Sequence, residues 1–152
     1  MLVPAVMVVM NLVYALAAYP AGVLSDNGSR MRVLVIGLCL LVVADLVLAL
    51  SSGVTGVMIG VALWGLHMGF TQGLLTTLVA DTAPPELRGT AFGMFNLLTG
   101  LALLAASIIA GALWDWIGPQ ATFLTGAAFT AVSLAGVVLL MSRIPTHPKS
   151  AG

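Results

Sequence analysis

Charged residues are scarce in this sequence. Only 7% of its 152 residues are Asp, Glu, Lys or Arg, whereas a soluble domain carries roughly 25%. The five basic residues balance the five acidic ones, so no basic excess is present to neutralise the phosphate backbone of a nucleic acid. The composition therefore excludes an ordinary water-soluble enzyme, and we expect no nucleic acid among the partners.

Residues that bind metals or form disulfides are also nearly absent. Cys39 is the single cysteine, so no disulfide can form within the chain. No cluster of cysteine and histidine accompanies it, which argues against a structural zinc site. An intramembrane enzyme would need a nucleophile or a metal cluster, and Asp45 and His67 have no third catalytic partner. We therefore expect no metal, no cofactor and no enzymatic activity.

Long apolar runs make up most of the chain. Together they contain a single charged residue, Asp45, and they cover residues 3–24, 33–50, 54–80, 90–113 and 120–141. A helix rises about 1.5 Å per residue, so roughly 20 apolar residues cross a hydrocarbon core about 30 Å thick. The runs lack the alternation of a membrane barrel. The sequence predicts an all-α, polytopic membrane helix bundle with five spans, which forms a single transmembrane domain over residues 1–152 in a lipid bilayer.

The basic residues all follow odd-numbered runs. Arg30 and Arg32 come after the first run, Arg88 after the third, and Arg143 and Lys149 after the fifth. Cytoplasmic connections of membrane proteins carry an excess of Lys and Arg. The pattern predicts a multi-pass protein of the cell (inner) membrane whose N-terminus lies outside and whose tail, 142–152, lies in the cytoplasm.

The odd number of runs is itself informative. Most helical transporters are built from repeated units, and five spans leave one repeat incomplete. We therefore expect residues 1–152 to be a fragment or one subunit, completed by a missing N-terminal half or a second subunit.

The connection after the first run, residues 22–32, combines a small-residue helix end with opposite charges. Gly22 precedes an acid, Asp26, and Arg30 stands four residues further on. A carboxylate at a helix end can accept backbone or arginine hydrogen bonds that form in one conformation and break in another. These three residues are candidates for a conformational-switch loop.

The connection after the third run has a second set of such residues. It begins at Asp81, and its two prolines stop the preceding helix. Glu86 suits the first turn of a new helix, where a carboxylate meets the positive end of the dipole. Glu86 and Arg88 complete the candidate switch loop.

Both connections resemble those of the major facilitator superfamily. The family signature Gly-x-Leu-(Ser/Ala)-Asp-Arg-x-Gly-Arg-(Arg/Lys) agrees with residues 22–32 at Gly22, Leu24, Ser25, Asp26 and Arg30, and differs at Asn27, Ser29 and Met31. Residues 84–93 resemble the loop that leads into the family's eleventh helix, and residues 113–119 resemble the turn between its last two helices. The resemblance implies that the chain is a partial second half, with spans that correspond to helices eight to twelve.

Small residues form seams along several predicted helices. The third run has Gly65, Gly69 and Gly73 on one face. The fourth run has a longer stripe of Gly89, Gly93, Asn96, Gly100, Ser107 and Gly111. Small residues let helix backbones approach closely in a bilayer, so both faces are expected to be helix contacts.

Polar and aromatic residues on the opposite face of the third run are candidates for substrate binding. Trp64, His67 and Thr71 lie there, and the resemblance implies that this helix is the tenth, which lines the central cavity in the family. Tyr14 of the first run is a further candidate. The alternative for His67 is a hydrogen bond to the backbone of a neighbouring helix.

Asp45 is the one acidic residue inside a run. Such residues are by default candidate functional sites, so Asp45 is our candidate for proton coupling. The resemblance implies that its helix is the peripheral ninth, which favours a structural or interfacial role instead.

The resemblance implies a secondary active transporter. It would move small, largely apolar molecules by alternating access, because few buried charges are present to bind an ionic substrate. A proton-coupled exporter, an antiporter of the plasma membrane, is the favoured form. The alternative is a non-transporting structural or regulatory membrane protein that acts as the partner of another half-transporter.

Overall fold

The computed structural model describes residues 2–143, which are helical apart from short connections and contain no strand. Its elements are α1 (Leu2–Asn27), α2 (Arg30–Leu50), α3 (Val54–Thr82), the 3-10 turn η1 (Pro85–Leu87), α4 (Arg88–Trp116) and α5 (Pro119–Arg143). All five long helices are long and apolar enough to cross a membrane. The predicted all-α membrane bundle is therefore confirmed. Residues 144–152, most of the predicted cytoplasmic tail, lie outside the described residues.

The helices extend beyond the apolar runs from which they were predicted. The first run ends at residue 24, but α1 continues through Ser25 and Asp26 to Asn27. The amide of Asn27 donates a hydrogen bond to the Val23 carbonyl, 2.9 Å away, inside that last turn. Hydropathy marks the length suited to hydrocarbon, whereas polar residues can continue a helix into the headgroup region. The difference therefore affects only the helix ends.

The turn between α4 and α5 depends on Gly118. Its φ of 119° lies in the left-handed region that glycine adopts without steric cost. Its amide and that of Ile117 both donate to the Leu113 carbonyl at 2.9 Å, which closes the end of α4. Pro119 then begins α5, a position where its missing N–H costs little.

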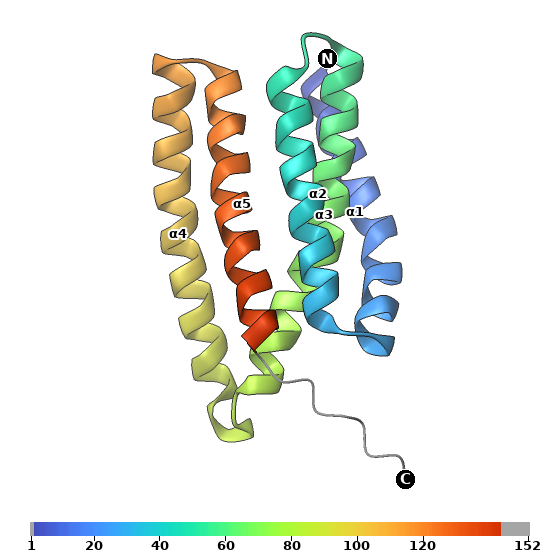
Figure 1. Ribbon diagram of the computed structural model, residues 1–152, viewed down its shortest axis with the longest axis vertical. Helices are drawn as coiled ribbons and strands as arrows, with labels where there is room; N and C mark the ends of the chain where they lie inside the picture. The colour runs from blue at the N-terminus through green and yellow to red at the C-terminus, as the bar shows by residue number, and fades with distance from the viewer. Residues whose placement is uncertain (1, 144–152) are drawn as a thin grey trace.

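The helices α1, α2 and α3 form a three-helix group, α5 packs on it almost as closely, and α4 is loosely attached (Figure 1). α3 packs along both α1 and α2, and α5 packs along α2. α4 is outermost and none of its residues is buried. Because successive helices run in opposite directions, Arg30, Arg32, Arg88 and Arg143 all lie at one end of the bundle. The two connections that carry the predicted motifs, between α1 and α2 and between α3 and α4, therefore lie at this same end of the bundle.

The predicted glycine seam of α3 is confirmed at two of its three positions. A Cβ at Gly65 would collide with the Met10 carbonyl of α1, and one at Gly69 would lie 2.7 Å from the Ala17 Cβ. Gly73 has no atom that close. The seam therefore brings the backbones of α1 and α3 together over its first two turns.

The prediction that the stripe on α4 forms a helix contact is wrong for the described residues. Gly89, Gly93, Gly100 and Gly111 meet nothing within 4 Å of a Cβ. Among the described helices α4 makes few contacts, and these are with α5 and α3. Small residues permit a close approach, but they cannot supply the helix that makes it.

We expect Gly65→Ala to destabilise the bundle. The added Cβ meets a backbone carbonyl that cannot rotate away, and such overpacking costs about 1–3 kcal/mol. Thermal unfolding in detergent, followed by loss of monodisperse protein, would measure the change. Gly73→Ala is the matched control on the same helix face, because its Cβ enters open space. Equal stability of the two variants would contradict the packing of α1 on α3.

Candidate functional site: a groove between two helices

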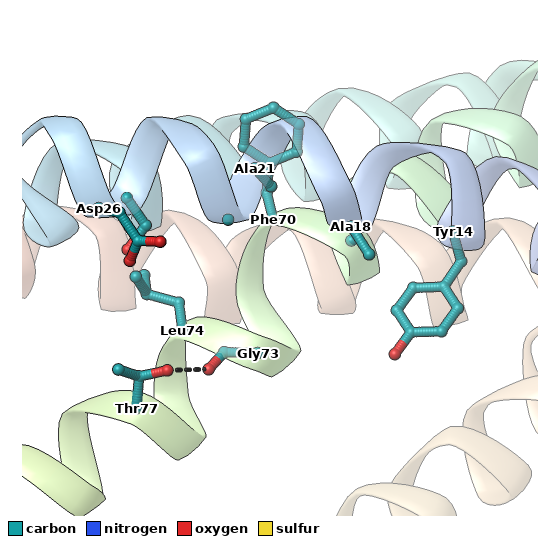
Figure 2. A pocket seen from close by; sticks show the side chains of 11 residues that line it. Tyr14, Ala18, Ala21, Asp26, Phe70, Gly73, Leu74 and Thr77 are labelled. Carbon is teal, nitrogen blue, oxygen red and sulfur yellow. Dashed lines mark hydrogen bonds between the residues drawn. The ribbon is translucent and has the colours of Figure 1, made fainter.

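A groove of about 280 Å³ runs between α1 and α3 towards the end of the bundle that carries Arg30. Small residues keep it open, since Gly22 and Gly73 have no atom within 4 Å of a Cβ. α1 contributes Tyr14, Ala18, Ala21, Gly22, Ser25 and Asp26, and α3 contributes Gly69, Phe70, Gly73, Leu74 and Thr77. Figure 2 shows Tyr14 and Asp26 near opposite ends of this lining.

Four of the lining residues carry polar side chains, and polar atoms contribute about as much of the exposed lining as apolar atoms do. The Thr77 hydroxyl donates to the Gly73 carbonyl at 2.8 Å, so its proton is already used within α3 (Figure 2). The Tyr14 phenol, the Ser25 hydroxyl and the exposed Asp26 carboxylate remain for other partners. Its walls are otherwise apolar or glycine. This lining suits a small molecule that presents both apolar and polar surface, with one phenol and one carboxylate to orient it.

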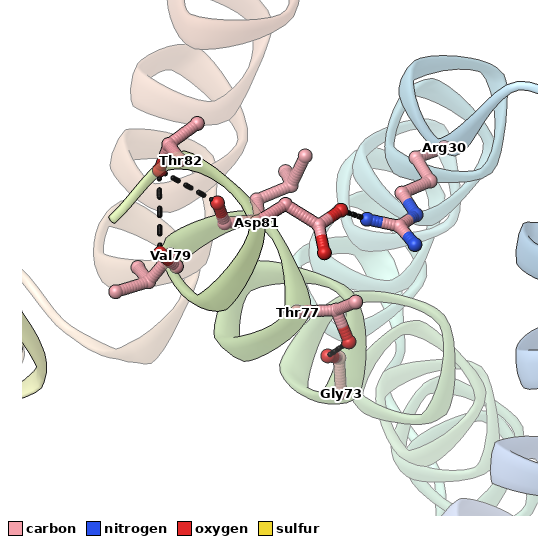
Figure 3. Close-up of polar contacts among 7 residues, drawn as sticks. Arg30, Gly73, Thr77, Val79, Asp81 and Thr82 are labelled. Carbon is pink, nitrogen blue, oxygen red and sulfur yellow. Dashed lines mark hydrogen bonds and ion pairs between the residues drawn. The ribbon is translucent and has the colours of Figure 1, made fainter. Parts of the chain in front are cut away.

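An ion pair joins the beginning of α2 to the end of α3 (Figure 3). The Arg30 guanidinium contacts the Asp81 carboxylate, and their side chains are 31% and 51% exposed. The sequence pattern predicts Arg30 in a switch loop but does not identify Asp81 as its partner. The antiparallel packing of α2 on α3 provides that partner, because it brings the start of one helix beside the end of the other.

The other predicted switch residues are not joined to this pair. Among residues 2–143, Asp26, Glu86 and Arg88 form no ion pair. Asp26 lies at the groove, and Glu86 lies in the 3-10 turn that precedes α4. Within residues 2–143, the ion pair of Arg30 with Asp81 is the charged contact that links the two predicted connections.

The four substrate-binding candidates do not come together at one place. Tyr14 lines the groove. His67 Nδ1 lies 2.8 Å from the Gly37 carbonyl of α2, the distance of a hydrogen bond in which the ring nitrogen donates. Thr71 is 5% exposed, donates to the His67 carbonyl at 3.0 Å and packs beside Gly37. His67 and Thr71 thus occupy the contact between α2 and α3, as the alternative for His67 anticipated.

Trp64 faces a second cavity, of about 710 Å³, at the opposite end of the bundle. That cavity lies among the ends of the helices, with Trp114 and Phe123 across from the three-helix group. The sequence patterns do not predict this cavity, because contacts between the helix ends cannot be derived from apolar periodicity.

Asp45 lies in the contact between α2 and α5. It is 5% exposed, and its Oδ2 would be 2.9 Å from a Cβ on Gly126. It lines neither the groove nor the second cavity. Within residues 2–143 no group of three or more metal-ligating side chains comes together.

Comparison with known proteins identifies the family. The family model described as Major Facilitator Superfamily matches residues 2–152. An uncharacterized MFS-type transporter of Methanocaldococcus jannaschii is 35% identical over 90% of this chain and 33% of its own length. The arabinose-proton symporter of Bacillus subtilis is 32% identical over 59% of this chain and 19% of its own length. The tetracenomycin C resistance and export protein of Streptomyces glaucescens is 28% identical over 91% of this chain and 26% of its own length.

The chain thus spans about a third of the length of the Methanocaldococcus jannaschii relative and less of the other two. The names of these relatives describe transport proteins, so the prediction of a transporter family rather than an enzyme is confirmed. Together with five apolar helices, the match makes this a multi-pass membrane protein. The family model and the relative of Methanocaldococcus jannaschii show that the chain belongs to the Major Facilitator Superfamily.

Proposed function

We propose that this chain is part of a secondary active transporter that exports small, largely apolar molecules by alternating access. The observation that carries the proposal is the groove between α1 and α3, whose lining of small, apolar and uncharged polar residues has one charged side chain, Asp26. A lining of this kind offers a neutral molecule contact area and one or two orienting groups. In the proposal Tyr14 contacts the substrate, and the ion pair of Arg30 with Asp81 holds one of the two conformations.

Export and proton coupling are the finer parts of the proposal. The tetracenomycin C export protein matches 91% of this chain, whereas the arabinose-proton symporter matches 59%. The wider match supports export, and exchange for protons would make the protein an antiporter. Asp45 stays the candidate for proton coupling, although its packing against Gly126 supports an interfacial role.

The transporter also needs helices beyond these five. Rocking of one bundle against another requires two bundles, and the uncovered stripe of α4 supports a further helix on that face. In the proposal the five helices correspond to helices eight to twelve of the family. A missing N-terminal half or a second subunit completes the transporter, which lies in the cell membrane with the basic end of the bundle in the cytoplasm.

Efflux of Nile red, a neutral fluorescent dye, tests the proposed function. Cells that express the intact protein should lose preloaded dye faster than cells without it, and an uncoupler that collapses the proton gradient should abolish the difference. Rapid efflux that is indifferent to the uncoupler would overturn proton coupling. Absence of efflux for a panel of neutral dyes would favour the alternative, a non-transporting partner. Robust flux by residues 1–152 alone as a monomer would overturn the need for a second bundle.

We expect Tyr14→Ala to lower dye efflux about tenfold, because loss of about 1.4 kcal/mol of aromatic contact corresponds to that factor. Tyr19→Ala is the matched control on the same helix, since Tyr19 is 80% exposed and does not line the groove. Equal loss of efflux in both variants at equal amounts of folded protein would remove Tyr14 from the substrate path.

A further inference from the structure

We propose that the second cavity, at the end of the bundle opposite the basic residues, binds a neutral amphiphile. We call it the aromatic cavity, after its residues Trp64, Trp114 and Phe123. Its volume of about 710 Å³ lies within the range of roughly 300–1,000 Å³ that is usual for small-molecule sites. The binding does not rest on the proposed transport activity, because it concerns a different place in the fold from the groove between α1 and α3.

The cavity is built by all five long helices or their ends. Val6 comes from α1, the end of α2 and the start of α3 form one wall, and the turn between α4 and α5 forms the other. The two walls belong to the three-helix group and to the α4–α5 pair (Figure 1). A molecule bound there would contact both parts of the bundle.

The aromatic side chains present surface that the protein itself does not cover. Trp64 is 38% exposed and Trp114 is 50% exposed. Trp114 is held edge-to-face against Phe123, with ring centroids 6.2 Å apart and an interplanar angle of 74°. Because this packing fixes one indole, the ring offers a preformed apolar contact at little cost in side-chain entropy.

The polarity of the lining selects the ligand class. No lining residue carries a formal charge, so an ion would leave water for a site without a partner. Val61 in the lining is 5% exposed, whereas Ser52 and Gln120 are exposed and polar, and we call these two residues the mouth of the cavity. An apolar body would lie against the aromatic rings and Val61, and an uncharged polar head would meet Ser52 and Gln120. A neutral amphiphile has this distribution, whether it is a lipid of the bilayer or a free compound.

Quenching of tryptophan fluorescence tests the proposal. The purified protein would carry Trp116→Phe, because Trp116 is 85% exposed and does not line the cavity. In nanodiscs of unbrominated phosphatidylcholine, brominated dodecyl maltoside should quench the remaining fluorescence along a saturable curve. Ser52→Phe should raise the half-saturating concentration about tenfold by blocking the mouth, which corresponds to about 1.4 kcal/mol.

Thr55→Phe is the matched control, since Thr55 is exposed in the first turn of α3 but does not line the cavity. Gln120→Phe blocks the same mouth from α5 and keeps the test decisive where Ser52→Phe does not fold. Quenching that rises linearly with the probe concentration would overturn the proposal. The same half-saturating concentration in both mouth variants and the control would also overturn it. A second arm uses nanodiscs of brominated phosphatidylcholine. If brominated lipid quenches the fluorescence and the mouth variants reduce this quenching, bilayer lipid is an occupant. If brominated lipid does not quench it but the brominated maltoside does so saturably, the occupant is a free amphiphile.

Discussion

Reversal of the charge at Asp81 should lower dye efflux about tenfold, because Asp81→Arg places two guanidinium groups where the structure has an ion pair. Two unit charges 4 Å apart interact by about 1 kcal/mol in water and by about 4 kcal/mol at an effective dielectric constant of 20. The pair is partly exposed, so its interaction falls between these limits. A shift of about 1.4 kcal/mol against the conformation that holds the pair is enough for a tenfold change.

The exchanged double variant separates the pair from its two residues. Arg30→Asp combined with Asp81→Arg restores opposite charges at the same contact, so efflux should return to within about twofold of the starting protein. Arg32→Asp is the control, because Arg32 is exposed on the same helix and forms no ion pair among residues 2–143. A double variant as slow as Asp81→Arg alone would show that the two charges do not act through each other.

The sequence sufficed for the helices because the bilayer imposes so strong a constraint. Each apolar run had the length that hydrocarbon requires, and each became a helix of similar or greater length. The sequence did not suffice to predict the packing of α4. The stripe through Gly93 and Gly100 is rich in glycine like the seam through Gly65, yet only the latter meets another helix among the described residues. Periodicity identifies a face that permits contact, and the identity of the neighbour depends on the three-dimensional arrangement.

The residues of the candidate site could likewise be predicted only in part. Tyr14, Gly22 and Asp26 do line one groove, because they follow one face of α1 towards its end. His67 and Thr71 share a face of α3, but α2 covers that face and the Gly37 carbonyl accepts the histidine's hydrogen bond. Asp81 was missed because its partner is 51 residues earlier in the chain. An acid at the end of one helix and an arginine at the start of its antiparallel neighbour form the signal that could have found it.

The second large effect is expected at the contact between α2 and α5. Gly126→Leu should leave much less folded protein, because even its Cβ would lie 2.9 Å from the Asp45 carboxylate oxygen. Overpacking of this kind costs about 1–3 kcal/mol. The α2–α5 contact is the main attachment of the α4–α5 pair to the three-helix group. Retention of monodisperse protein during heating in detergent would measure the loss.

A control variant and a compensating variant identify the cause of this loss of folded protein. Gly136→Leu lies on the same helix in open space, so its stability should stay close to that of the starting protein. Asp45→Ala removes the carboxylate that the new side chain meets, so adding it to Gly126→Leu should recover part of the folded protein. If Gly126→Leu were as stable as Gly136→Leu, the close packing of α5 on Asp45 would be wrong.

Asp45→Asn then distinguishes an interfacial role from proton coupling. The amide has nearly the shape of the carboxylate, so it fits beside Gly126 and preserves the helix contact, but it cannot gain and lose a proton at physiological pH. An interfacial role therefore predicts that Asp45→Asn keeps both its folded protein and its uncoupler-sensitive efflux of Nile red. Loss of the proton dependence at an unchanged amount of folded protein would instead make Asp45 the coupling carboxylate. The steric effect of Gly126→Leu would persist in that case, because it depends on the space between the helices and not on the proton.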